Sequence, residues 1–200
     1  MKTKSLLTIL LIFTSITFFA QKNNFGVKGG VNLSNQNASI DVPNLPVTIT
    51  TIGISSFHLG VFGEINLSEK SSILTEVLYT REGSMVNLQA IAFEQKVDYI
   101  KIPILYSHNI FTDNLSVHFG PQFGYLVKDY VEFDNNDGDP FTDADFKSFE
   151  FSTVLGAEYK INKKLKVGAR YNLGITDISN TDEGSFKNRN LQFYVGFQIF

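Results

Sequence analysis

The sequence predicts an all-β protein, an eight-stranded antiparallel up-and-down transmembrane β-barrel. Three observations predict this fold. Apolar and polar residues alternate with a period of two in eight segments, each roughly 10 residues long, which is the length of a tilted strand that crosses a bilayer. Short and long connections alternate between these segments, as they do in outer-membrane barrels. The chain also begins with a segment typical of exported proteins.

The export segment has a basic start and an apolar body. Lys2 and Lys4 precede an apolar run over residues 6–19, and Ala20 fits the last position before cleavage. The run is shorter than the ~20 apolar residues of a spanning helix, so a membrane anchor is the weaker interpretation. Residues 1–20 are therefore expected to be a signal peptide, and residues 21–200 the barrel domain.

Charge and cysteine content narrow the function classes. Removing residues 1–20 lowers the basic count from 17 to 15 against 20 acidic residues, which leaves a net charge of −5. Without a basic patch, no nucleic-acid partner is expected. The chain has no Cys, and so it has neither a disulfide framework nor a lipid-modified cysteine as a tether. An exported chain with neither a membrane anchor nor a lipid tether is free in the periplasm, secreted, or integrated as a barrel in the cell outer membrane, which is the expected location.

Each of the eight segments carries aliphatic and aromatic residues on one face and glycine or polar residues on the other. The clearest alternation begins at Leu165, where Val167, Ala169 and Tyr171 alternate with glycine and charged residues. In the third segment, Leu74 and Leu78 interrupt the pattern. The predicted strands cover residues 25–33, 57–67, 72–82, 96–108, 115–127, 149–161, 165–175 and 191–200.

The connections between these segments alternate in length. Three are short, at residues 68–71, 109–114 and 162–164. Four are long, at residues 34–56, 83–95, 128–148 and 176–190. Short periplasmic turns and long extracellular loops are typical of outer-membrane barrels, and they count against a soluble lipocalin-like barrel.

The polar face indicates how the interior is filled. Glycines and charges of both signs suit a narrow lumen in which ions pair and hydrogen-bond, while the apolar face meets lipid. An eight-stranded barrel is just wide enough to be filled by its own side chains, so we expect a plugged interior in preference to a substrate path. The predicted lumen charge network consists of Lys28, Glu64, Glu76, Lys101, Glu158, Lys160 and Arg170.

Several short motifs occur in a characteristic order. YIKIPIL at residues 99–105 precedes GPQFGYL at 120–126, LGAEY at 155–159 and ARYNLGIT at 169–176. Together they resemble the PorT-type outer-membrane β-barrel family over nearly the whole mature chain. The resemblance implies an outer-membrane barrel of Gram-negative bacteria with a gliding or type IX secretion tradition, without catalytic residues to transfer. It also implies a role accessory to protein secretion, with secretion-system partners.

Two further partners are expected. The predicted apolar face meets outer-membrane lipid. The C-terminal strand ends at Phe200, and a terminal aromatic residue is common where a barrel-assembly machine recognises the last strand.

A hydrolase interpretation is the weaker alternative for the polar residues. His58 and His118 fall on the predicted lumen face, with Ser116, Glu64 and Asp98 in the neighbourhood. A catalytic triad is recognised by its geometry, and Ser116 has no nucleophile-elbow context. We therefore expect polar packing, no enzymatic activity and no cofactor.

Two of the long connections carry their own signals. Asp134, Asp137 and Asp139 are weak candidates for a Ca²⁺ site, since Ca²⁺ prefers several oxygen ligands, although Phe133 stands where an EF-hand loop needs its first Asp. The alternative is a solvated loop. The first long connection contains Val42, Leu45, Val47, Ile49, Ile52 and Ile54, which indicate either a partner site or a hairpin above the membrane.

The function expected from these observations is a structural or interaction role for an integral outer-membrane barrel. A narrow small-solute channel is the second expectation, and a lipid-modifying barrel enzyme is the third.

Overall fold

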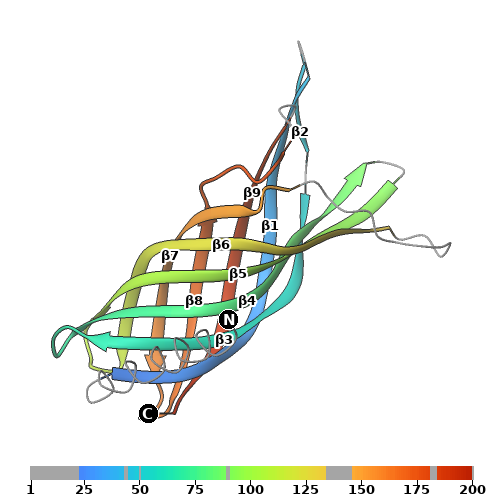
Figure 1. The fold of residues 1–200 in the computed structure, drawn as a ribbon. Coiled ribbons are helices and arrows are strands. Elements are labelled where there is room, and N and C mark those ends of the chain that lie inside the picture. The colour runs from blue at the N-terminus through green and yellow to red at the C-terminus, as the bar shows by residue number, and fades with distance from the viewer. Residues whose placement is uncertain are drawn as a thin grey trace, which may run out of the picture.

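The computed structural model describes residues 23–42, 45–49, 51–88, 91–133, 146–180 and 184–199. Within these ranges, all regular structure is β-strand, and the strands form one antiparallel sheet that closes on itself (Figure 1). The predicted signal peptide lies outside the described residues. The strands are β1 (Asn23–Val42), β2 (Leu45–Ile49), β3 (Thr51–Asn66), β4 (Ser71–Leu88), β5 (Ile91–Asn109), β6 (Leu115–Phe133), β7 (Phe149–Lys160), β8 (Leu165–Gly174) and β9 (Gly184–Gln198).

Eight strands, all but β2, make the wall of the barrel. Each pairs with its neighbour in chain order, from β1 to β3 and onward to β9, so the topology is up-and-down. The seam between β9 and β1 closes the barrel, with a register that runs from Gly26 opposite Gln198 to Ile40 opposite Gly184. The predicted fold class is therefore confirmed, with one added short strand. Among the described residues, no helix is long and apolar enough to cross a membrane.

The long connections are shorter than the sequence predicts, because the strands continue past the predicted membrane-spanning segments. β4 ends at Leu88 and β5 begins at Ile91, so most of the loop predicted at 83–95 is a hairpin. Likewise, β1 reaches Val42 and pairs with β2 (Figure 1). Beyond the bilayer, backbone pairing continues without the alternation that lipid imposes, and the pattern therefore misses it.

Register shifts interrupt the ladders near the outer ends of the strands. One lies between Gly53 and His58 on β3, and another between Asp98 and Tyr99 on β5. A bulge bends its strand and increases the local twist, which accounts for the way these hairpins leave the wall of the barrel.

The predicted division into two faces holds along the wall. Apolar side chains such as Leu59, Leu155 and Val195 point outward and are more than half exposed, at 52%, 65% and 51%. Their strand neighbours point inward and are buried, except Gly60 and Gly156, which are half-buried. Leu74 and Leu78, which interrupt the pattern, are lumen residues: Leu74 packs in the small apolar cluster formed by Phe62, Leu74, Leu105 and Val154.

Candidate functional site

The barrel interior is filled by polar side chains supplied by all eight wall strands. Its charged members carry five cations and five carboxylates, which balance within the described residues. We call this set the lumen network, and it consists of Lys28, Glu64, Glu76, Glu82, Lys101, Glu150, Glu158, Lys160, Lys166 and Arg170.

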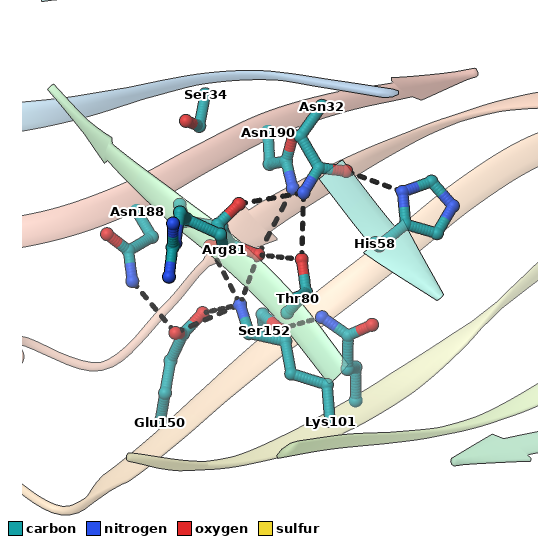
Figure 2. A network of polar contacts seen from close by, with 12 residues as sticks. Asn32, Ser34, His58, Thr80, Arg81, Lys101, Glu150, Ser152, Asn188 and Asn190 are labelled. Carbon is teal, nitrogen blue, oxygen red and sulfur yellow. Dashed lines mark hydrogen bonds and ion pairs between the residues drawn. The ribbon is translucent and has the colours of Figure 1, made fainter. Parts of the chain in front are cut away.

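The outer part of the network is centred on Lys101. Its Nζ lies 2.8 Å from Glu82 Oε1 and 3.1 Å from Glu150 Oε2, and all three side chains are almost fully buried. Asn188 donates to Glu150 at 2.8 Å (Figure 2). Asn190 donates to Glu82 at 3.1 Å. One cation thus holds two carboxylates together, and amide donors from β9 satisfy further lone pairs of both.

An uncharged layer adjoins this cluster. Asn32 donates from Nδ2 to Thr80 Oγ1 at 2.9 Å, and its Oδ1 lies 2.6 Å from His58 Nδ1 (Figure 2). Gln192 donates to the same Asn32 oxygen at 3.0 Å. Because these residues come from β1, β3, β4 and β9, the layer ties the closing seam to the neighbouring wall.

The inner part of the network is centred on Glu76. Arg170 Nη2 lies 2.7 Å from Glu76 Oε2, and Lys28 Nζ lies 2.9 Å from Glu76 Oε1. Lys28 Nζ also lies 3.4 Å from the centre of the Tyr194 ring, and the Tyr194 hydroxyl donates to Glu158 at 3.1 Å. This cation–π contact adds to the stabilisation of a buried ammonium group.

Lys166 and Glu158 complete the inner part. Lys166 Nζ lies 3.0 Å from Glu158 Oε1 and 3.8 Å from the centre of the Phe62 ring. The end that leads to the short turns is closed by Glu64, which accepts from Ser72 at 2.8 Å and lies 4.0 Å from Lys160 Nζ. Lys160 is the most exposed cation of the described network, with 31% of its side chain accessible.

Glycines on neighbouring strands make room for the large lumen side chains. A Cβ atom at Gly26 would collide with the Phe62 ring, and one at Gly168 would collide with the Tyr194 ring. In the same way, a Cβ at Gly196 would meet the stem of Lys166. The glycine-rich polar face is therefore the complement in shape of the aromatic and cationic side chains that fill the interior.

All seven residues predicted for the charge network point into the lumen, and the structure distributes them over three groups. Arg170, Lys28 and Glu76 meet directly, whereas Lys101 pairs with carboxylates outside the predicted set. Glu82, Glu150 and Lys166 also belong to the network, although they are not among the seven residues predicted for it. The period-two pattern placed all three on the polar face and would have found them.

The hydrolase residues are not brought together. Ser116 donates to the Glu158 carbonyl at 3.5 Å, and both ring nitrogens of His118 are without a hydrogen-bond partner among the described residues. Asp98 lies on the outer wall, where it accepts from Arg81 at 2.7 Å and from the Tyr79 hydroxyl at 2.6 Å. No Ser–His–carboxylate relay forms from this set.

The described residues contain no group of three or more His, Asp or Glu side chains placed to hold a metal ion. The candidate Ca²⁺ ligands Asp134, Asp137 and Asp139 lie in residues 134–145, outside the described ranges. That site stays a prediction.

Known protein families and solved structures include some that are similar to this chain. A family model described as outer membrane protein beta-barrel domain matches residues 19–180. The solved structure of Neisserial surface protein A is similar, with a TM-score of 0.51 and 15% identity over 86% of this chain and 96% of that chain. No curated protein matches the chain.

Two further solved structures are similar to this chain. Ail, the attachment invasion locus protein of Yersinia pestis, has a TM-score of 0.48 and 9% identity over 90% of this chain and 100% of that chain. OprG from Pseudomonas aeruginosa has a TM-score of 0.47 and 13% identity over 88% of this chain and 96% of that chain.

Proposed function

Because the chain belongs to the outer membrane protein beta-barrel domain family and resides in the outer membrane, we propose that it is a structural and interaction protein. In this proposal the barrel is an anchor with a closed interior. The segments outside the bilayer make the contacts with a partner.

The observation that carries the proposal is the bridge between Arg170 and Glu76. It joins β8 to β4 at 2.7 Å, and both side chains are completely shielded from solvent. The cluster around Lys101 closes the lumen a second time toward the outer ends of the strands. A solute would have to break buried ion pairs to pass, and such pairs are costly to break because each leaves an uncompensated charge.

The segments that project beyond the wall offer the contact surface. Above the barrel, β2 pairs with β1 through residues 38–42 and 45–49, and β1 pairs there with β9 (Figure 1). The hairpin of β4 and β5 projects separately. These paired strands carry their backbone beyond the wall of the barrel, as binding loops on a fixed scaffold do.

We further propose that the chain is of the PorT type and accessory to protein secretion, with secretion-system partners. The motifs at 99–105, 120–126, 155–159 and 169–176 support this assignment by their resemblance to that family. The barrel-assembly machinery is proposed to recognise the last strand, β9, which ends at Gln198 in the structure.

Cross-linking in intact cells tests the interaction role. One variant replaces residues 38–49 by a two-residue turn, and a second shortens the other projecting segment, the β4–β5 hairpin, at residues 86–93 in the same way. We expect both to keep heat-modifiable mobility on gels, and the first to lose a cross-linked partner that the wild type retains. An unchanged set of cross-links in both variants would contradict the proposal.

Conductance in planar bilayers separates the closed anchor from a small-solute channel. The wild type is expected to give no discrete conductance. The positive control is a variant that removes both closures of the lumen, Glu76→Ala/Arg170→Ala combined with Glu82→Ala/Lys101→Ala/Glu150→Ala. A stable conductance of the wild type at neutral pH would favour the channel.

A further inference from the structure

A groove of about 630 Å³ lies on the outer wall, and its lining includes Glu158 and Tyr194 of the wall between it and the lumen. It spans β6 to β9 and β1, with Ala157 and Ala169 directly opposite each other on its floor. Ala169 in turn lies opposite Phe193, and Phe193 lies opposite Val31. Two small residues between bulky ones make a trough in a wall that is otherwise covered by large apolar side chains.

The groove lies in the half of the wall next to the short turns. Ala157 comes four residues before Ile161, where the turn between β7 and β8 begins. At about 3.3 Å per residue, that places the floor about 13 Å along the strand from the turn. The hydrocarbon core is ~30 Å thick and the strands are tilted, so the groove belongs to the periplasmic leaflet.

The turn beneath the groove is basic. It carries Lys163 and Lys164, both exposed. Of the three short turns in the described ranges, the one at 67–70 carries Glu69 and Lys70, and the one at 110–114 carries Asp113. A net charge of +2 is thus found only at the turn that adjoins the groove, among these three.

We propose that the groove and its two lysines bind one anionic phospholipid of the periplasmic leaflet. An acyl chain lies over Ala157 and Ala169, and the phosphate lies against Lys163 and Lys164. The rest of the wall is also covered by lipid, so apolar burial alone does not select this place. The selection comes from close packing against small residues and from charge. This inference requires only the outer-membrane location, not the proposed interaction role.

A second copy of the chain fits the groove less well. A two-fold dimer would place this surface against itself. Two troughs would then face each other, and two turns of charge +2 would lie close together. A lipid supplies both the convex apolar chain and the negative charge that the surface lacks.

Native mass spectrometry of the purified full-length barrel in mild detergent tests the site. The probes are phosphatidylglycerol and phosphatidylcholine with identical acyl chains, added at equal concentration. We expect one retained phosphatidylglycerol per barrel and about 30-fold less phosphatidylcholine, since two lysines near a charged lipid contribute about 1 kcal/mol each.

Two variants divide the site into its parts. Ala157→Leu/Ala169→Leu fills the trough and is expected to reduce retention of both lipids by about threefold or more. Lys163→Gln/Lys164→Gln is expected to remove the preference for phosphatidylglycerol and to leave phosphatidylcholine unchanged. The matched controls are Thr75→Leu on β4, across the barrel from β8, and Lys70→Gln in the β3–β4 turn, and neither is expected to change retention.

Three outcomes would overturn the site. The first is equal retention of the two lipids by the wild type. The second is unchanged retention in the trough variant, after heat-modifiability has shown that it is folded. The third is a dimer of the wild type that the trough variant lacks, because the groove would then be a contact between copies.

Discussion

Arg170 and Glu76 join opposite walls of the barrel. β8 and β4 are four strands apart in both directions around the eight-stranded ring, so the contact of 2.7 Å between Arg170 Nη2 and Glu76 Oε2 crosses the lumen along a diameter. Lys28 reaches the same carboxylate from β1 at 2.9 Å. Three strands that share no ladder are thereby fixed relative to one another.

Replacing Glu76 tests this bridge. Glu76→Gln leaves the charges of Lys28 and Arg170 buried without their shared carboxylate, and we expect it to lower the free energy of unfolding by about 3–5 kcal/mol. Urea titration of the barrel in micelles measures the loss. The control Glu69→Gln, in an exposed turn, is expected to stay within about 0.5 kcal/mol. The triple change Lys28→Met/Glu76→Leu/Arg170→Met is expected to recover much of the stability, and a triple variant weaker than Glu76→Gln would contradict the role given to charge burial.

Glycine replacements test the packing of the lumen. Gly168→Val places a side chain into the Tyr194 ring and is expected to cost about 1–3 kcal/mol by overpacking. Gly63→Val is the matched control on the outer wall, because a Cβ at Gly63 meets nothing within 4 Å. Thermal unfolding in micelles compares the two. Equal losses of stability in the two variants would mean that these glycines are needed for their backbone conformation, and not for the space that they leave to neighbouring side chains.

The loop between β8 and β9 is expected to be sensitive to acid. Burial raises the pKa of Asp177, but the backbone N–H groups of Ser179 and Phe186, which donate to its carboxylate at 3.0 and 2.8 Å, hold this pKa below its usual range. A carboxyl with a lowered folded pKa stabilises the loop above the unfolded pKa of about 3.9 and loses that contribution as the pH falls through the folded value.

NMR of the Ser179 and Phe186 amides follows this titration. Their shifts are expected to stay constant down to about pH 4 and to change only below it. Asp177→Asn should give the acid-like shifts at neutral pH. A midpoint at or above the ordinary carboxyl pKa would show that the two amides do not hold the carboxylate.

Phe111 is expected to anchor the β5–β6 turn to the membrane interface. Its φ of 59° is left-handed, which costs about 1–2 kcal/mol for a residue other than glycine. The ring is 96% exposed on the isolated chain, and placing it at the lipid interface returns about 1.5–3 kcal/mol. Because the second effect is larger, Phe111→Gly should lower stability in lipid vesicles by about 1 kcal/mol. If Phe111→Gly were more stable than the wild type, the Phe111 ring of the wild type would lie in water and not at the lipid interface.

The sequence predicted the wall of the barrel well because lipid imposes a strict period of two on every strand. It did not predict where strands such as β4 and β5 end, because pairing continues above the bilayer under no such constraint. The positions of Phe62 and Leu74 were harder to explain from the sequence. They are apolar side chains inside a polar lumen, where a core needs volume as well as charge.

The period-two pattern also could not predict which lumen residues pair with one another, and the reason is different. Alternation assigns a side chain to a face, but the partner depends on the tilt and stagger of the strands around the ring. Lys101 therefore could be placed in the interior, but its two carboxylate partners, Glu82 on its neighbour β4 and Glu150 two strands away on β7, could not be chosen from sequence alone.

The seam between β1 and β9 also dictates an order of assembly. Asn32 and Gln192 meet across it although 160 positions separate them in the chain, so closure brings together the most distant parts of the ring and carries the largest loop-closure entropy. Each intermediate strand has to be in register before the seam can close. Removing β9 would expose the unpaired edges of β1 and β8, which the hydrocarbon region does not tolerate, so such a chain is expected to fail to insert as this barrel.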